Sequence, residues 1–166
     1  GAKNDSLLAL VGAAGSAINM HLGRITGTSP TVDLADKNKT GAYNAFLTSF
    51  LQKWKMKADT SIYTAYAYDA AYAVGIAISA ASKDGGSVTP GRVSEMLLRF
   101  NGTNRITVGR NDYLAAKNFL AGSPGFTLQG ATGDIRFTPH GDRLGGLYEV
   151  WGIDVTKPAF TSMPAN

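Results

Sequence analysis

The chain of 166 residues contains no cysteine. This absence excludes disulfide bonds, zinc sites with thiolate ligands and a cysteine nucleophile. It does not identify the cellular compartment, because many exported bacterial proteins also lack cysteine.

A membrane-spanning run of apolar residues is also missing. The longest weakly polar stretch, Ala65 to Ala81, contains Asp69 and several tyrosines, so no transmembrane helix is expected. No signal peptide is recognisable, and the chain starts with Gly1 and Ala2 instead of Met. We therefore expect a processed or truncated chain, whose export signal, if it is exported, lay upstream.

Motifs for catalysis and cofactor binding are absent from the sequence. His21 and His140 lie far apart, and neither has a second ligand at metal-binding spacing. Ser16 and Ser123 lack the GxSxG pattern of a nucleophile elbow. The glycines of the segment GATGD (130–134) match neither a dinucleotide-binding motif nor a P-loop. We expect no enzyme activity, no metal and no cofactor, and we expect His140 to lie exposed in a turn.

The charge of the chain is weakly basic. The net charge is +4 and the pI about 9.4, but the basic residues are scattered. Their densest run is Lys53, Lys55 and Lys57, which we interpret as the solvated face of a helix. Nucleic-acid binding needs a clustered basic stripe, so it is not expected.

Helical patterns dominate the middle of the sequence. An apolar stripe with a period of 3.6 residues predicts a helix from Gly41 to Lys57. An alanine-rich helix is expected from Ile62 to Ser82. A third helix is predicted from Pro90 to Phe100, with Thr89 as its N-cap. The segment 112–121 is interpreted as a short helix or an irregular segment.

Strand patterns are expected near both ends of the chain. Ser6 to Val11 is predicted as a buried strand, although a helix is not excluded, and Leu22 to Thr28 as another strand, followed by a break at Ser29-Pro30. Alternation at 134–138 and at 147–155 predicts a β-hairpin. Residues 156–166 are expected to form a mobile tail with few anchors.

The segment Tyr63 to Tyr72 (YTAYAYDAAY) is unusually rich in tyrosine. Tyrosines at the start of a helix can line a small-molecule site, where rings stack on a ligand and hydroxyls orient it. They can equally pack against neighbouring elements with their hydroxyls in water. Residue chemistry alone favours packing.

Three segments, in order and spacing, resemble the extracellular ligand-binding receptor family, the type I periplasmic solute-binding proteins typified by branched-chain amino-acid binding proteins of ABC transporters. Tyr66 to Ala81 is similar to the family's YDA helix, and Val88 to Phe100 to the helix that follows. Phe126 to Val150, with the pattern GxTGxIxF, resembles its closing signature. The resemblance covers about residues 40 to 155.

The resemblance implies an α/β, three-layer fold of two lobes joined by crossover strands, with ligand held between the lobes. This chain would be the carboxy-terminal half, residues 1–155, covering mainly one lobe plus crossover strands. It would be either a stable core left by truncation or proteolysis, or a fragment that pairs as a homodimer to cover exposed sheet.

The resemblance also implies ligand-binding residues. The start of the YDA helix faces the cleft in the family, which suggests Tyr63 and Tyr66, and less strongly Asp69. The loop 12–16 also faces the cleft, which suggests Gly12, Ala13 and Ser16. Amino-acid binders commonly have a carboxylate in this loop, whereas this chain has Ala13 and Ala14. An amino-acid ligand is therefore in doubt, because a buried ammonium without a partner is costly.

The function implied is non-catalytic binding of a small molecule, such as an amino acid, an organic acid or an aromatic compound. The parent protein would be part of an ABC-type transporter or a sensor, and its partner would be a membrane permease. It would reside in the periplasm or outside the cell, with a lipid anchor as one alternative. A lipoprotein-type protein-interaction module using the same fold is the alternative function. It would be favoured if the aromatic helix were fully buried and no pocket formed.

Overall fold

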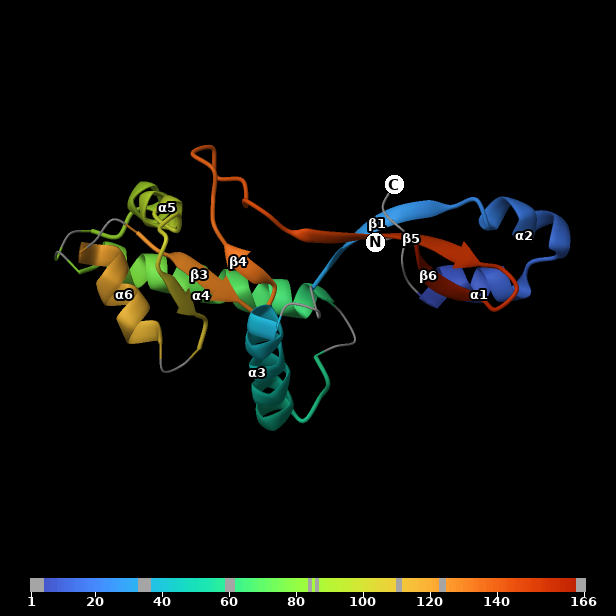
Figure 1. Ribbon diagram of the computed structural model, residues 1–166, viewed down its shortest axis with the longest axis horizontal. Coiled ribbons are helices and arrows are strands. Elements are labelled where there is room, and N and C mark those ends of the chain that lie inside the picture. The colour runs from blue at the N-terminus through green and yellow to red at the C-terminus, as the bar shows by residue number, and fades with distance from the viewer. Residues whose placement is uncertain are drawn as a thin grey trace. The chain divides into compact units, whose positions relative to one another are not determined.

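The computed structural model describes residues 5–32, 37–58, 62–83, 85, 87–109, 112–122 and 125–163. Within these residues the fold is mixed α/β and contains two small sheets (Figure 1). The chain divides into two compact units. The first unit combines Gly1–Thr31 with Leu147–Asn166, and the second comprises Val32–Gly146. The expected α/β class is therefore confirmed.

The first unit combines two helices with an antiparallel sheet. Its helices are α1 (Asp5–Ala13) and α2 (Ser16–Leu22). Its strands are β1 (Thr26–Thr31), β5 (Leu147–Asp154) and β6 (Ala159–Met163), in the order β1-β5-β6.

The core of the first unit forms where α1 packs against the central strand. Val11 of α1 is buried together with Trp151 and Ile153 of β5. Phe160 of β6 packs against Trp151 with a ring-centroid distance of 5.2 Å. Two segments that are far apart in the sequence therefore share one hydrophobic core.

The strand predicted at Ser6 to Val11 is wrong, since this segment belongs to α1. Leucine and alanine, which favour helices, make up most of the run. Leu7 and Val11 are four residues apart and both join the core, as expected for one face of a helix. The apolar run was too short to distinguish the two structures by periodicity.

The second predicted strand is shifted along the chain. It was expected at Leu22 to Thr28 and is observed at Thr26–Thr31, so the predicted break at Ser29-Pro30 is wrong. Pro30 pairs with Tyr148 in register. Proline lacks the N–H of a central strand but is tolerated in an edge strand, and β1 is an edge of its sheet.

The predicted hairpin at 134–155 is largely wrong. Its two strands do not pair with each other: the first part pairs with β3, and β5 pairs with β1 and β6. Of the predicted hairpin, only the isolated β-bridge between Phe137 and Arg143 is observed. The expected turn around His140 is confirmed, because the N–H of Thr138 donates to Asp142 O at 2.7 Å. Alternation indicates a strand but does not identify its partner.

The prediction that residues 156–166 hold few anchors is also wrong for part of this segment. Ala159–Met163 forms β6, which is hydrogen-bonded to β5 with Ile153 opposite Phe160. Residues 164–166 lie outside the described residues.

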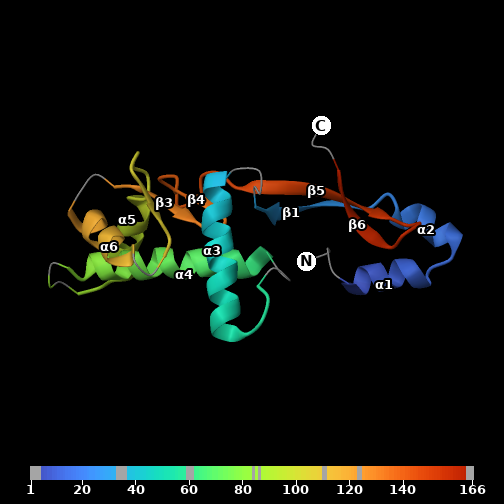
Figure 2. The same cartoon turned by 60° about the horizontal axis from the view of Figure 1, so that its bottom comes forward.

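The second unit packs helices around the other sheet. Its helices are α3 (Lys37–Trp54), α4 (Ile62–Ala81), α5 (Pro90–Leu98) and α6 (Tyr113–Gly122). Its strands are β2 (Arg105–Thr107), β3 (Thr127–Gly130) and β4 (Gly133–Ile135), in the order β2-β3-β4. β2 is parallel to β3, and β4 is antiparallel to it. Figure 2 shows α3 crossing α4.

The predicted helices of the second unit are confirmed, with small shifts at their ends. The N–H of Arg92 donates to Thr89 Oγ1 at 3.3 Å, so Thr89 caps α5 as expected. The segment at 112–121 is a helix. In α4, small residues such as Ala73 and Ala77 are buried against Phe100 and Leu128. Their size allows the helix to approach its neighbours closely.

No helix among the described residues is long and apolar enough to cross a membrane.

Candidate functional site

The tyrosines of α4 lie on different faces of the helix. Tyr63 is the most accessible, with 58% of its surface exposed. Tyr66 is half-buried. Tyr68 and Tyr72 are also half-buried, and their ring centroids are 4.8 Å apart. The interpretation of these rings as packing groups is therefore correct for Tyr68 and Tyr72, whereas Tyr63 presents its ring to solvent.

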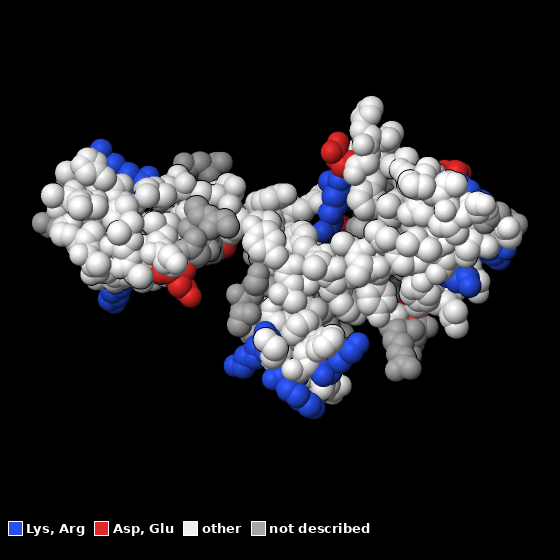
Figure 3. Space-filling model, turned by 180° about the vertical axis from the view of Figure 1, so that it is seen from behind, with Lys and Arg blue, Asp and Glu red and all other residues white. Residues whose placement is uncertain are grey.

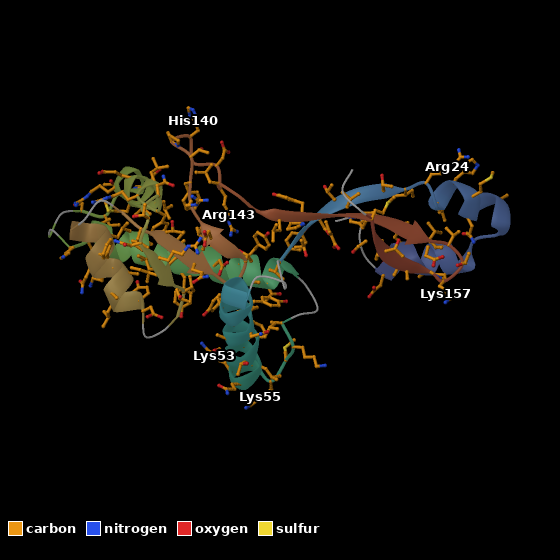
Figure 4. All side chains as sticks on the ribbon, viewed as in Figure 1. Arg24, Lys53, Lys55, His140, Arg143 and Lys157 are labelled. Atoms are coloured by element: carbon orange, nitrogen blue, oxygen red, sulfur yellow. The ribbon has the colours of Figure 1, made fainter. Side chains whose placement is uncertain are left out.

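Tyr66 lies against a cation. The guanidinium carbon of Arg143 lies 5.3 Å from the centroid of the Tyr66 ring. The same guanidinium donates to Thr132 Oγ1 at 2.8 Å and to Asp134 O at 3.1 Å. Figure 4 places Arg143 on the segment between β4 and β5, with His140 at the tip of the loop that this segment forms. Arg143 therefore links the tyrosine of α4 to the turn that precedes β4.

Asp69 also forms hydrogen bonds with the turn that precedes β4. Its side chain is only 2% exposed. Its carboxylate accepts hydrogen bonds from the N–H of Ala131 and the N–H of Thr132, both at 2.8 Å, and from the Thr132 hydroxyl. We refer to Asp69, Thr132 and Arg143 as the turn lock. Asp69 and Arg143 both form hydrogen bonds directly with Thr132.

Burial raises the pKa of the Asp69 carboxyl above its ordinary value. The hydrogen bonds from Thr132 and Ala131 and the charge of Arg143 oppose this rise, because they favour the ionised form. The hydrogen bonds that the buried Asp69 carboxylate accepts all come from the protein itself. Asp69 therefore has a structural role in this structure, which the sequence did not predict.

A shallow hollow lies between α4 and α6. It has a volume of about 430 Å³ and is lined by Ala71, Tyr72, Tyr113 and Leu114. The hydroxyl of Tyr113 donates to Gly75 O at 2.8 Å, which fixes the ring of Tyr113 at one wall. Burial is the main cause that raises the pKa of the neighbouring Tyr68 hydroxyl.

The residues predicted at 12–16 lie in the first unit. Gly12 and Ala13 form the last turn of α1, and Ser16 is the first residue of α2. The segment therefore joins two helices, and the expected loop after a strand is not observed. Both Gly12 and Ala13 are exposed. Tyr63, Tyr66 and Asp69 belong to the second unit, so the pairing of the two groups around one ligand stays a prediction.

The two histidines of the sequence belong to different units. His21 lies in the last turn of α2 and His140 lies in the turn after β4, and both are exposed, as expected for His140. Within the described residues, no group of three His, Asp or Glu side chains could hold a metal ion.

Sequence reasoning missed Arg143 and Gly130. A Cβ on Gly130 would lie 2.6 Å from Asp69 Oδ1, so only glycine leaves room for the carboxylate. One signal was present in the sequence, because an aspartate in an apolar helix needs partners once it is buried. The sequence could not show that the partners lie more than sixty residues away.

The chain has a mixed α/β fold with two small sheets, and it passes from the first unit into the second and back. The family described as receptor family ligand binding region matches residues 12–156, and the chain belongs to this family. It is the family of branched-chain amino-acid binding proteins and type I periplasmic-binding-protein-like domains, as the resemblance implied. No curated protein and no solved structure matches the chain.

Proposed function

We propose that this chain is the non-catalytic, small-molecule-binding component of an ABC-type transporter or of a sensor. The observation that carries the proposal is the match of the ligand-binding family over residues 12–156. Location in the periplasm or outside the cell and docking to a membrane permease belong to the same proposal. So does pairing of two copies of the chain.

Tyr63 and Tyr66 are the ligand contacts that we propose in the second unit. The exposed ring of Tyr63 is available for stacking on a ligand. Tyr66 is already held by Arg143 before any ligand binds, and such preorganisation lowers the entropic cost of binding. Asp69 contributes indirectly, because it holds the turn to which Arg143 bonds.

Gly12, Ala13 and Ser16 are the proposed contacts in the first unit. Ala13 and Ala14 offer no charge to a ligand ammonium, so an organic acid or an aromatic compound is a better candidate than an amino acid.

The connections between the units support closure about a hinge. The chain leaves the first unit after Thr31 and returns at Leu147. These two residues are opposite each other at the end of the β1–β5 pair. Gly145, just before the return, has a φ of 76°, a conformation that favours glycine. Rotation of one unit against the other about these connections is part of the proposal.

A thermal-shift screen with amino acids, organic acids and aromatic compounds tests the proposal. A ligand present at a hundredfold excess over its Kd stabilises the folded state by about 2.7 kcal/mol. This stabilisation corresponds to a rise in Tm of roughly 5–10 °C for a chain of this size. If no compound of these classes raises the Tm, the proposal is wrong.

Substitution then tests the residues. Y63S and Y66S are expected to weaken binding of any ligand found, by about tenfold each for a lost aromatic contact. Y148S is the matched control, since Tyr148 is an exposed tyrosine, 69% accessible, in the other unit. Equal effects of all three substitutions would exclude a specific role for Tyr63 and Tyr66.

The alternative function, a protein-interaction module, would be favoured by a fully buried aromatic helix and the absence of a pocket. The 58% exposure of Tyr63 does not meet the first of these conditions.

A further inference from the structure

One end of α3 is exposed along its whole length. The first half of the helix is anchored, with Ala42 8% and Phe46 2% exposed. Every residue from Leu51 to Lys57 is exposed. Figure 2 shows this end of α3 extending beyond α4. We call residues 51–57 the α3 tip.

The α3 tip exposes large apolar side chains. Leu51 is 48% exposed, Trp54 57% and Met56 66%. These three residues lie within six positions of one another in the sequence, and exposed apolar patches rimmed by polar residues mark interaction sites. Their exposure costs free energy in water that a suitable partner would recover.

Lysines separate these apolar side chains. Lys53, Lys55 and Lys57 alternate with Trp54 and Met56, and the sequence has no Asp or Glu from residue 37 to residue 58. The ammonium of Lys53 lies 5.1 Å from the centroid of the Trp54 ring. Figure 3 shows basic side chains gathered at this end of the second unit, and Figure 4 labels Lys53 and Lys55 there. Within the described part of the chain, none of the three lysines has an acidic partner.

We propose that the α3 tip binds the surface of a membrane that contains anionic lipids. The ammonium groups of Lys53, Lys55 and Lys57 would pair with lipid phosphates. The side chains of Trp54 and Met56 would enter the interface at the depth of the headgroups. This interaction is separate from ligand binding and goes beyond the proposed function.

The chemistry of the tip fits a lipid interface better than other partners. An acidic protein segment would pair with the charges of the lysines but would not explain the exposed side chains of Trp54 and Met56. Tryptophan is enriched where membrane meets water, and lysine stems lie along apolar surface while their ammonium groups remain hydrated. A second copy of the same tip would bring like charges together, which is unfavourable.

The shape of the tip also fits this partner. Lys55 directly follows α3 and has a φ of 57°, in the left-handed conformation, and its N–H donates to Leu51 O at 2.9 Å. This hydrogen bond closes the helix at Lys55 and turns the chain sharply. The apolar and basic side chains are thus presented together at the end of a rigid element.

Flotation of the full chain with lipid vesicles tests the proposal. We expect binding to vesicles of phosphatidylglycerol and phosphatidylcholine, none to phosphatidylcholine alone, and loss of binding at high salt. The triple variant K53Q/K55Q/K57Q should bind about a hundredfold more weakly, since each lysine near an anionic surface contributes about 1 kcal/mol. The matched control is R24Q/K83Q/K157Q, which removes the same charge from exposed sites elsewhere and should bind as the parent does.

Tryptophan fluorescence reports insertion directly. The chain has two tryptophans, Trp54 at 57% and Trp151 at 3% exposure. Anionic vesicles should shift the emission of the parent to shorter wavelength, and the shift should disappear in W54F. Equal losses in the two triple variants, or binding to polyglutamate but not to vesicles, would overturn the proposal. A dimer in solution that W54F dissociates would also overturn it.

Discussion

At the scale of single residues, Gly130 decides whether Asp69 can hold the turn before β4. A Cβ at position 130 would lie 2.5 Å from Asp69 Cγ. We therefore expect G130A to lower the free energy of unfolding by about 3 kcal/mol or more, because the displaced carboxylate would stay buried without its donors. Urea denaturation measures this loss.

The control for this change is G91A. A Cβ at Gly91, in the first turn of α5, would meet nothing within 4 Å. Alanine is a better helix former than glycine, so stability should be unchanged or higher by up to about 1 kcal/mol. A loss in G91A equal to that in G130A would show that the Asp69 contact is unimportant.

The ionisation of Asp69 gives a second prediction at this scale. Because burial raises its pKa in the folded state, the folded state holds the proton more tightly than the unfolded state. The free energy of unfolding should therefore fall as pH rises from the ordinary carboxyl pKa through the raised value. R143Q should raise the Asp69 pKa further, since Arg143 favours the ionised form.

Carbon-13 NMR of the carboxyl groups measures these pKa values. Asp154 provides an internal control, because hydrogen bonds from Thr156 and Lys157 lower its pKa. Asp154 should titrate below the ordinary value and should not respond to R143Q. If Asp69 titrated below Asp154, the assigned environment of Asp69 would be incorrect.

At the scale of elements, the contact between β1 and β5 depends on a glycine opposite a tryptophan. Gly27 pairs with Trp151, and a Cβ on Gly27 would lie 2.7 Å from Cε2 of the indole ring. G27A should displace the ring, shift the emission of Trp151 to longer wavelength and destabilise the first unit by about 1–3 kcal/mol. The W54F background isolates the Trp151 signal.

G12A is the matched change in the same unit. A Cβ on Gly12 would meet Pro158 at 3.7 Å, an ordinary contact. The emission of Trp151 should therefore stay as in the parent. An unshifted emission in G27A would argue against the pairing of β1 with β5.

Helices were predictable at this scale because their signal is local. The apolar stripe of α3, the alanine-rich sequence of α4 and the Thr89 cap of α5 all act within a few residues. Strand partners were not predictable, because β5 pairs with β1 more than a hundred residues away. The short apolar run of α1 was assigned wrongly, since it gives no period long enough to separate helix from strand.

At the scale of the whole molecule, each unit has its own hydrophobic core. Val11, Trp151 and Ile153 belong to the first unit, whereas Ile76, Phe100 and the residues around them belong to the second. The second unit is continuous in sequence. We therefore expect residues 32–146, expressed alone, to fold with helical circular dichroism and a cooperative urea transition.

The G130A substitution serves as the control for this fragment. It should destabilise residues 32–146 as much as the whole chain, because Asp69 and its partners all lie within them. A fragment without a cooperative transition would show that the second unit needs the first in order to fold.

The sequence by itself determined the family, the α/β class and the helices of the second unit. The order of the motifs and the helical periodicity depend only on residues that are close together in the sequence. The sequence also identified Tyr63 and Tyr66 as candidates. Only the tertiary structure assigned Asp69 to the turn lock, brought Arg143 onto Tyr66 and left the α3 tip exposed. These features depend on contacts between distant segments, and burial and pairing of side chains arise only when such segments pack together.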